Sequence, residues 1–192
     1  MLFVVAGLGN PGDRYDRTRH NVGAEVIKYL ARTEGSQLSF RKTCNFLGTE
    51  VKLEGASTLL VFPQNFMNDS GKTISCVMRR NPSLGIGSLV VVHDELDLPV
   101  GVVRVKRGGG LAGHNGLRSL SLHVGTNDFI RVRIGIDRPQ SGGDVSNWVL
   151  SRPSIKEREA LDVVIERAAE AVRSIIRDGV DQAMNYFNVT AK

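Results

Sequence analysis

Short apolar runs alternate along the chain with stretches in which apolar residues recur at helical spacing. The apolar runs predict strands, and they lie at residues 2–8, 47–53, 58–62, 89–92, 98–105 and 129–136. Glu54-Gly55-Ala56 separates two of these runs and is typical of a hairpin. Strands that alternate with helices indicate an α/β fold.

Helices are predicted where the apolar spacing changes to about 3.6 residues. They run from Val22 up to Gly35, from a cap at 68–70 up to Asn81-Pro82, over 117–124, from the capping box at 154–157 through 176, and over 180–186. No internal repeat or linker divides the sequence, and 192 residues is the size of one domain. We therefore expect a single domain over residues 1–192.

Two of the predicted strands end in residues that can do chemistry. The run 2–8 breaks into glycines around Asn10 and is followed by Arg19-His20-Asn21, while 89–92 leads directly into His93-Asp94-Glu95. In open α/β sheets this edge is where ligands bind. Adjacent strand residues point to opposite faces, so only one of His93 and Asp94 can enter a cleft there. Pro11 follows too soon for the helix that a dinucleotide site needs.

Each histidine also has an alternative, structural interpretation. His20 could be a solvated residue at the start of a helix, and His114 a buried loop residue. His123 lies among apolar residues and is predicted to be an ordinary helix residue. A metal site built from His20, His93 or His114 with Asp94 stays open, although no HxH, HExxH or HxxxH spacing supports it.

The net charge of +5 lies in one segment of the chain. Between residues 101 and 140 there are seven basic and two acidic side chains, and the remainder is balanced. Arg131 and Arg133 share one face of their predicted strand, so we expect them to project together. A localised basic patch favours binding to phosphate groups, and a solvated surface is the alternative.

Composition excludes several classes of protein. Hydrophobic residues make up 41% and charged residues 23%, as in globular proteins, and no apolar run reaches the roughly 20 residues that span a bilayer. The N-terminus lacks the basic start of a signal peptide, so we expect a cytoplasmic protein without membrane attachment. Cys44 and Cys76 are far apart in sequence and are predicted to be reduced thiols.

A glycine-rich stretch at residues 108–116 contains the His114-Asn115 pair. So many glycines serve either a tight backbone path or a space for a bulky ligand, into which Asn115 would point. We expect this loop and the end of the chain, after Gly179, to form a movable gate over the cleft.

Five motifs together resemble those of the bacterial-type peptidyl-tRNA hydrolases. They are Gly7 to Gly12 with Asn10, Thr18 to Asn21, Phe66 to Gly71, His93 to Pro99 and Gly113 to Gly116. They stand in the family's order and close to its spacing, and the resemblance covers essentially the whole chain. It implies a single α/β domain with a mixed twisted sheet flanked by helices, a monomer, and no metal or organic cofactor.

The reaction that the resemblance implies is hydrolysis of the ester between a peptide and the 3′ ribose of tRNA. His20 would be the base that activates water, and Asp94 would orient its imidazole. The partner would be peptidyl-tRNA, bound through its acceptor stem and 3′ end. The resemblance also assigns a catalytic role to Asn10 and Asn115. It implies that the substrate is contacted by Tyr15, Met67, Asn68 and His114. The 5′ phosphate of the acceptor stem would be bound by Lys106 and Arg133.

Elementary chemistry agrees with this assignment. Ester hydrolysis needs a positioned water, a base with a pKa near the working pH and donors for the developing oxyanion, which imidazole and amide groups supply. The sequence contains neither a GxSxG motif nor a cysteine beside a base, so nothing in it suggests a covalent nucleophile. The chain departs from the family at Ala112, usually glycine, where a positive φ would cost about 1 kcal/mol.

Two other functions remain open at this point. A non-catalytic RNA-binding protein with the same fold would tolerate loss of His20, Asp94 or Asn10, yet all three are present. An unrelated small-molecule hydrolase or aminopeptidase would need a metal or a nucleophile and would not need a basic segment. Binding that weakens steeply with salt would separate the RNA-dependent functions from the last one.

Overall fold

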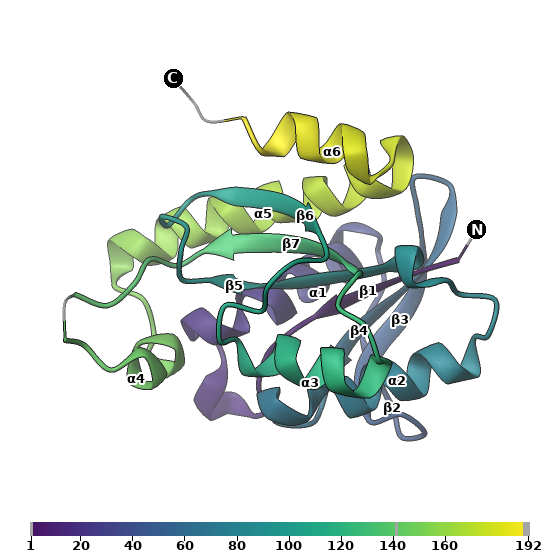
Figure 1. The fold of residues 1–192 in the computed structure, drawn as a ribbon, viewed down its shortest axis with the longest axis horizontal. Helices are drawn as coiled ribbons and strands as arrows, with labels where there is room; N and C mark the ends of the chain where they lie inside the picture. Colours follow the sequence, from purple (N-terminus) through teal and green to yellow (C-terminus); the bar gives the residue numbers. More distant parts are fainter. Residues whose placement is uncertain (1, 141, 190–192) are drawn as a thin grey trace.

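The computed structural model describes residues 2–140 and 142–189, which form one α/β unit (Figure 1). Its strands are β1 (Leu2–Gly7), β2 (Ser39–Arg41), β3 (Phe46–Leu53), β4 (Ala56–Pro63), β5 (Leu89–Glu95), β6 (Val103–Arg107) and β7 (Ile130–Gly135). Its α-helices are α1 (Val22–Thr33), α2 (Ser70–Arg80), α3 (Asn115–Val124), α4 (Val145–Leu150), α5 (Ile155–Asp178) and α6 (Val180–Phe187).

The strands form one mixed, twisted sheet in the order β2-β3-β4-β1-β5-β7-β6. The central pairs β4–β1, β1–β5 and β5–β7 are parallel, and the outer pairs are antiparallel. β4 lies on one side of β1 and β5 on the other, so the order of the sheet reverses at β1. The crevice beyond the carboxyl ends of β1 and β5 is therefore the expected place for a ligand.

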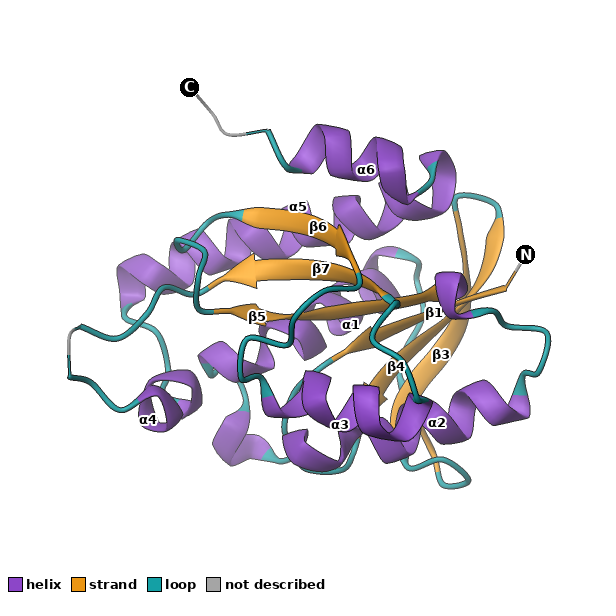
Figure 2. Ribbon diagram, in the orientation of Figure 1, coloured by secondary structure: helices purple, strands orange, loops and turns teal. Residues whose placement is uncertain are grey.

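Helices cover both faces of the sheet (Figure 2). α1, α5 and α6 share one apolar core with the side of the sheet that carries Val5, Val90 and Val132. α2 and α3 share a second core with Val4 and Val91 on the opposite side. The alternation of side chains along β1 and β5 supplies both cores, which explains why these strands are apolar throughout.

Several predicted boundaries shift for local reasons. β5 continues through His93, Asp94 and Glu95 because these residues pair with Arg133, Ile134 and Gly135 of β7. β6 begins at Val103, later than predicted, because Pro99 and Gly101 belong to a turn that Val102 N closes onto Pro99 O at 3.2 Å. The capping box of α5 is confirmed, with the Ser154 and Glu157 side chains each bonded to the other's backbone N–H.

Two elements were not predicted from the sequence. β2 has three exposed residues, and α4 has six, with Asp144 as its cap. Neither is long enough to establish an apolar period. α4 proves important, because it forms one wall of the cavity described below.

The cysteine prediction is wrong, because Cys44 and Cys76 form a disulfide. Cys44 lies just before β3 and Cys76 lies on α2, and their Cα atoms are 5.6 Å apart. The fold brings together two segments that are 32 residues apart in sequence, a proximity that spacing alone does not reveal. The disulfide thus ties α2 to the start of β3.

The last described residues, after α6, lie at the β6 edge of the sheet. The Asn188 side chain accepts from Val105 N at 2.9 Å and donates to Val105 O at 2.8 Å, so it covers that edge as a neighbouring strand would. No residue of α6 lines the cavity, and α4 does so instead. The described part of the chain end therefore does not border the cavity, whereas Ala112 and Gly113 of the glycine-rich loop do, and a movable gate made by that loop stays a prediction. No helix among the described residues is long and apolar enough to cross a membrane.

Candidate active site

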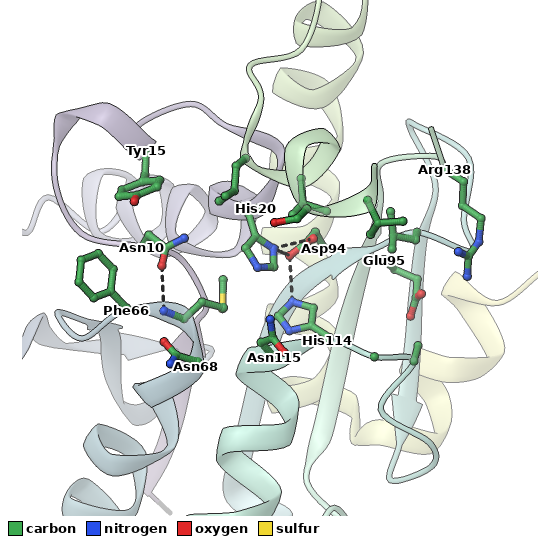
Figure 3. Close-up of a pocket in the computed structure, with 18 residues that line it drawn as sticks. Asn10, Tyr15, His20, Phe66, Asn68, Asp94, Glu95, His114, Asn115 and Arg138 are labelled. Atoms are coloured by element: carbon green, nitrogen blue, oxygen red, sulfur yellow. Dashed lines mark hydrogen bonds and ion pairs between the residues drawn. The ribbon is translucent and has the colours of Figure 1, made fainter. Parts of the chain in front are cut away.

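A cavity of about 700 Å³ lies at the carboxyl ends of β1 and β5 (Figure 3). Every residue predicted for catalysis or substrate contact lines it, namely Asn10, Tyr15, His20, Met67, Asn68, Asp94, His114 and Asn115. They come from four separate parts of the chain. Phe66, Glu95, Leu96, Ala112, Gly113, Arg138 and four residues of α4 complete the lining.

Two close backbone contacts bring these parts together. A Cβ on Gly7, at the end of β1, would lie 2.1 Å from Gly23 O, so only glycine lets the first turn of α1 approach β1. A Cβ on Gly71 would lie 2.0 Å from Ser119 O, which allows α2 and α3 to pack closely. The first contact places His20, just before α1, over the end of the sheet. The second brings α2, preceded by Asn68, against α3.

His20 and Asp94 form a buried pair at the centre of the cavity. His20 Nδ1 lies 2.9 Å from both carboxylate oxygens of Asp94 (Figure 3). With Nδ1–H donating to the carboxylate, the neutral ring carries its lone pair on Nε2. Burial opposes protonation of His20, but the charge of Asp94 and this hydrogen bond outweigh it and raise the pKa of the imidazole.

His114 gives Asp94 a second donor. Its Nδ1 accepts from the backbone N–H groups of Gly116 and Leu117 at 3.1 and 3.4 Å, which caps α3. The proton of the neutral ring is then on Nε2, which donates to Asp94 Oδ1 at 3.0 Å. Burial alone would raise the pKa of Asp94, but the two histidines lower it well below its usual value. Asp94 is therefore an anion held from two sides.

His93 does not enter the cavity, as the alternation of strand residues predicts. Its Nδ1–H donates to the backbone oxygen of Asp94 at 2.7 Å, and the ring packs edge-on to His114 with centroids 5.1 Å apart. Burial, together with His114, lowers the pKa of His93 to about 3. His93 therefore stays neutral. His123 is an ordinary residue of α3 that bonds to Ser119 O, also as predicted.

A network of amides fixes Asn10. Asn10 N donates to Asn21 Oδ1 and Asn21 Nδ2 donates to Asn10 O, each at 2.9 Å. Met67 N donates to Asn10 Oδ1 at 2.8 Å, so the side-chain oxygen is occupied and Nδ2 is the group left to donate to a ligand. Sequence reasoning missed the role of Asn21, although Asn21 stands in the motif that contains His20.

Within the described residues, His20, Asp94 and His114 form a group whose ligand-type atoms lie within 4.8 Å of one another. Two imidazoles and a carboxylate are a donor set that zinc accepts. However, both histidines already direct a ring nitrogen at Asp94 within hydrogen-bond distance. Hydrogen bonding therefore accounts for the arrangement of all three groups without an ion.

The predicted phosphate-binding residues lie outside the cavity lining. Arg133 Nε donates to Glu95 Oε2 at 3.0 Å, and Glu95 itself lines the cavity. Lys106 is exposed on β6 and pairs in register with Arg131 of β7, so Lys106, Arg131 and Arg133 share one face of the sheet. The basic segment thus adjoins one end of the cavity.

Arg131 differs from the prediction that it projects with Arg133. It shares the face but is only 2% exposed, because the glycine-rich loop lies over it. Its Nη1 donates to Gly110 O at 2.8 Å, while Nε and Nη2 have no partner among the described residues. In the same loop Ala112 has a φ of 48°, the positive value that the family's usual glycine would adopt without strain.

Fold and site together define a single-domain α/β protein with a buried histidine–aspartate pair in a cavity beside a basic surface, an arrangement suited to general-base chemistry. The sequence model of the family described as peptidyl-tRNA hydrolase matches residues 4–192. The chain belongs to the peptidyl-tRNA hydrolase family, and the prediction from the motifs is confirmed.

Relatives match over nearly their whole length. The peptidyl-tRNA hydrolase of Rubrobacter xylanophilus is 47% identical over 185 residues, which are 96% of this chain and 99% of that protein. The peptidyl-tRNA hydrolase of Rhodococcus opacus is 44% identical over 182 residues, 95% of each chain. The crystal structure of the Acinetobacter baumannii peptidyl-tRNA hydrolase is 36% identical, with a TM-score of 0.91 over 98% of this chain and 95% of that one. The mixed α/β fold predicted from the sequence is thereby confirmed.

Proposed function

We propose that this chain hydrolyses the ester that joins a peptide to the 3′ ribose of tRNA, with His20 as the general base and Asp94 as the group that orients it. The observation that carries the proposal is the bond from His20 Nδ1 to Asp94 within a cavity that amide side chains line. It leaves Nε2 as the basic atom of the ring. Amides complement this base, since they stabilise an oxyanion without titrating.

In the proposed reaction, Nε2 takes a proton from a water molecule as its oxygen attacks the ester carbonyl. Negative charge then develops on the carbonyl oxygen, and this oxygen accepts hydrogen bonds from the amide groups of Asn10, Asn68 and Asn115. When the carbon–oxygen bond to the ribose breaks, the imidazolium returns its proton to the 3′ oxygen. The products are a tRNA with a free 3′ hydroxyl group and a peptide carboxylic acid, which then loses its proton to solvent.

Asp94 has two tasks in this scheme. It fixes the tautomer of His20, and its negative charge stabilises the imidazolium that forms during the reaction. His114 holds Asp94 from the other side and keeps it ionised. Tyr15 and Met67 line the part of the cavity that we assign to the substrate.

We assign the 5′ phosphate of the acceptor stem to Lys106 and Arg133. Both lie on the sheet face next to the cavity, and Glu95 orients Arg133 by accepting from its Nε. Arginine and lysine bind phosphate through charge-assisted hydrogen bonds. From the family resemblance we also infer a cytoplasmic monomer that needs no metal, and no step above requires a second chain.

Substitution of the basic pair should weaken tRNA binding through electrostatics alone. The logarithm of the tRNA association constant falls linearly with the logarithm of the salt concentration. Lys106→Ala and Arg133→Ala are each expected to make this slope shallower by about 1, because each removes one phosphate contact. kcat should stay close to that of the wild type. The measurement is binding of tRNA over a series of salt concentrations. Lys52→Ala, an exposed lysine on β3, is the control. Equal slopes for all four proteins would contradict the assignment.

The function itself is tested by incubating the purified chain with N-acylated aminoacyl-tRNA in EDTA. Release of free tRNA is expected to continue unchanged, because the proposed base and oxyanion donors are all side chains. Activity that disappears in EDTA and returns with added zinc would instead support a metal at His20, Asp94 and His114. Binding of tRNA without any release would support a non-catalytic RNA-binding protein.

A further inference from the structure

Arg19, the neighbour of His20, is buried and contacts α4 and the start of α5. We propose that Arg19 is a positioning residue that holds α4 in place as a wall of the active-site cavity. This inference rests on the proposed function only in that the cavity is taken as the place where substrate binds. It concerns a residue that does not itself line the cavity.

The guanidinium of Arg19 makes contacts on three sides. Its Nη1 donates to Ser151 Oγ at 2.6 Å, just after the end of α4, and to Arg152 O at 3.3 Å. Its Nη2 donates to both carboxylate oxygens of Glu157 at 2.9 and 3.0 Å. Its Cζ lies 3.7 Å from the centroid of the Trp148 ring, a cation–π contact. Arg19 N also donates to Ser151 O at 3.1 Å.

These contacts matter because α4 has little else to hold it. A helix of six residues is not stable by itself. In Figure 1 α4 lies at one end of the sheet, beside the purple segment that links β1 to α1. Besides the contacts with Arg19, Trp148 Nε1 donates to Asp137 O at 2.8 Å and Val149 packs into the core. Arg19 therefore supplies the charged part of the docking.

The side of α4 that faces the cavity shows what this docking serves. Val145, Ser146, Val149 and Leu150 line the cavity, as do Ala112 and Gly113 of the glycine-rich loop. If α4 detaches, the cavity loses this wall, whereas the bonds from His20 to Asp94 and from Met67 N to Asn10 involve none of these residues. Loss of the Arg19 contacts should therefore impair binding of substrate more than the chemical step.

The contacts with Glu157 do not depend on pH in the working range. Burial would raise the pKa of Glu157, but hydrogen bonds from Ser154 and Arg19 lower it to about 2. Arginine is always charged. The pair is therefore ionised wherever His20 titrates, and loss of the pair should leave the pH dependence of the reaction unchanged.

The test is Arg19→Lys, which keeps the charge but loses the planar group that binds Glu157 in two places and stacks on Trp148. If the docked fraction of α4 falls to about one-tenth, KM for peptidyl-tRNA rises roughly tenfold. kcat and the midpoint of the pH–rate profile should match the wild type. Trp148 is the only tryptophan in the chain, so its fluorescence should become more accessible to a soluble quencher.

Arg158→Lys is the matched control. Arg158 is also a largely buried arginine paired with two carboxylates, Glu25 and Asp162, but these pairs join α5 to α1 and stay within α5. Arg158→Lys should lower the free energy of unfolding about as much as Arg19→Lys does, while KM for peptidyl-tRNA stays unchanged. An equal rise of KM in both variants, or a fall of kcat in Arg19→Lys with KM unchanged, would overturn the proposal.

A second pair of variants covers the case in which Arg19→Lys does not fold. Trp148→Leu removes the aromatic face under the guanidinium and should raise KM, whereas Trp148→Phe keeps an aromatic face and should restore KM towards that of the wild type. If both variants have the KM of the wild type, α4 is not held through Arg19. If turnover survives in His20→Ala, the proposed mechanism fails, and that result is independent of these KM values.

Discussion

His20→Ala is expected to lower kcat of peptidyl-tRNA hydrolysis by roughly 10²- to 10⁴-fold, the contribution of a well-placed general base. Asp94 orients His20 with Nε2 left as its basic nitrogen, whereas the other ring nitrogen of His114 accepts from the backbone of α3. Binding of tRNA should survive, because Lys106 and Arg133 lie outside the cavity lining. The measurements are single-turnover hydrolysis and tRNA affinity on the same preparation.

His123→Ala is the control for this substitution. His123 lies on α3, and among the described residues its side chain bonds to Ser119 O of the same helix, so turnover should stay at the level of the wild type. Hydrolysis by His20→Ala within tenfold of the wild type would remove His20 as the base. Loss of tRNA binding together with turnover would mean that the substitution disrupts the fold of the site.

Asp94→Asn is expected to reduce kcat by up to roughly 10⁴-fold, the loss that follows the same substitution in a serine-protease triad. Asparagine has almost the same shape, but it carries no charge to stabilise the imidazolium. Its NH₂ group can also face His20 or His114 and favour the wrong tautomer. Hydrolysis should be measured with excess enzyme, since substrate binding is expected to change little. A variant with near-normal kcat would contradict the role of Asp94.

The same substitution should change how stability depends on pH. Asp94 raises the pKa of His20 in the folded protein. This pairing stabilises the fold fully below the unfolded pKa of about 6.5, and the stabilisation is lost as pH rises through the folded pKa. The stability difference between wild type and Asp94→Asn should therefore shrink from pH 6 to pH 9. Urea unfolding at several pH values measures it.

The sequence predicts the central part of the fold well, because β1 and β5 are apolar over their whole length and supply both cores. The late start of β6 follows from Pro99 and Gly101, whose effect depends on a turn that no periodicity reveals. α4 is six residues long and is held by Arg19, a residue more than 120 positions away in sequence. Contacts of that kind arise only when the chain has folded.

The residues of the site also differ in whether the sequence alone predicts them. His20, Asp94 and Asn10 are predictable because each stands at the end of an apolar strand or in a recognisable motif. The supporting bonds from Asn21 to Asn10 and from His114 to Asp94 are not, since they depend on how α1 and α3 meet the sheet. The disulfide between Cys44 and Cys76 was missed for the same reason.

The proposed mechanism depends on the imidazole of His20, paired with Asp94, removing a proton from water. The most direct measurement is an NMR titration of the His20 ring beside the pH–rate profile of the same protein in EDTA. If His20 is the base, kcat/KM rises with pH along one limb whose midpoint coincides with the pKa of His20, and both lie above 6.5. A rate with no inflection at the pKa of His20 would contradict this mechanism.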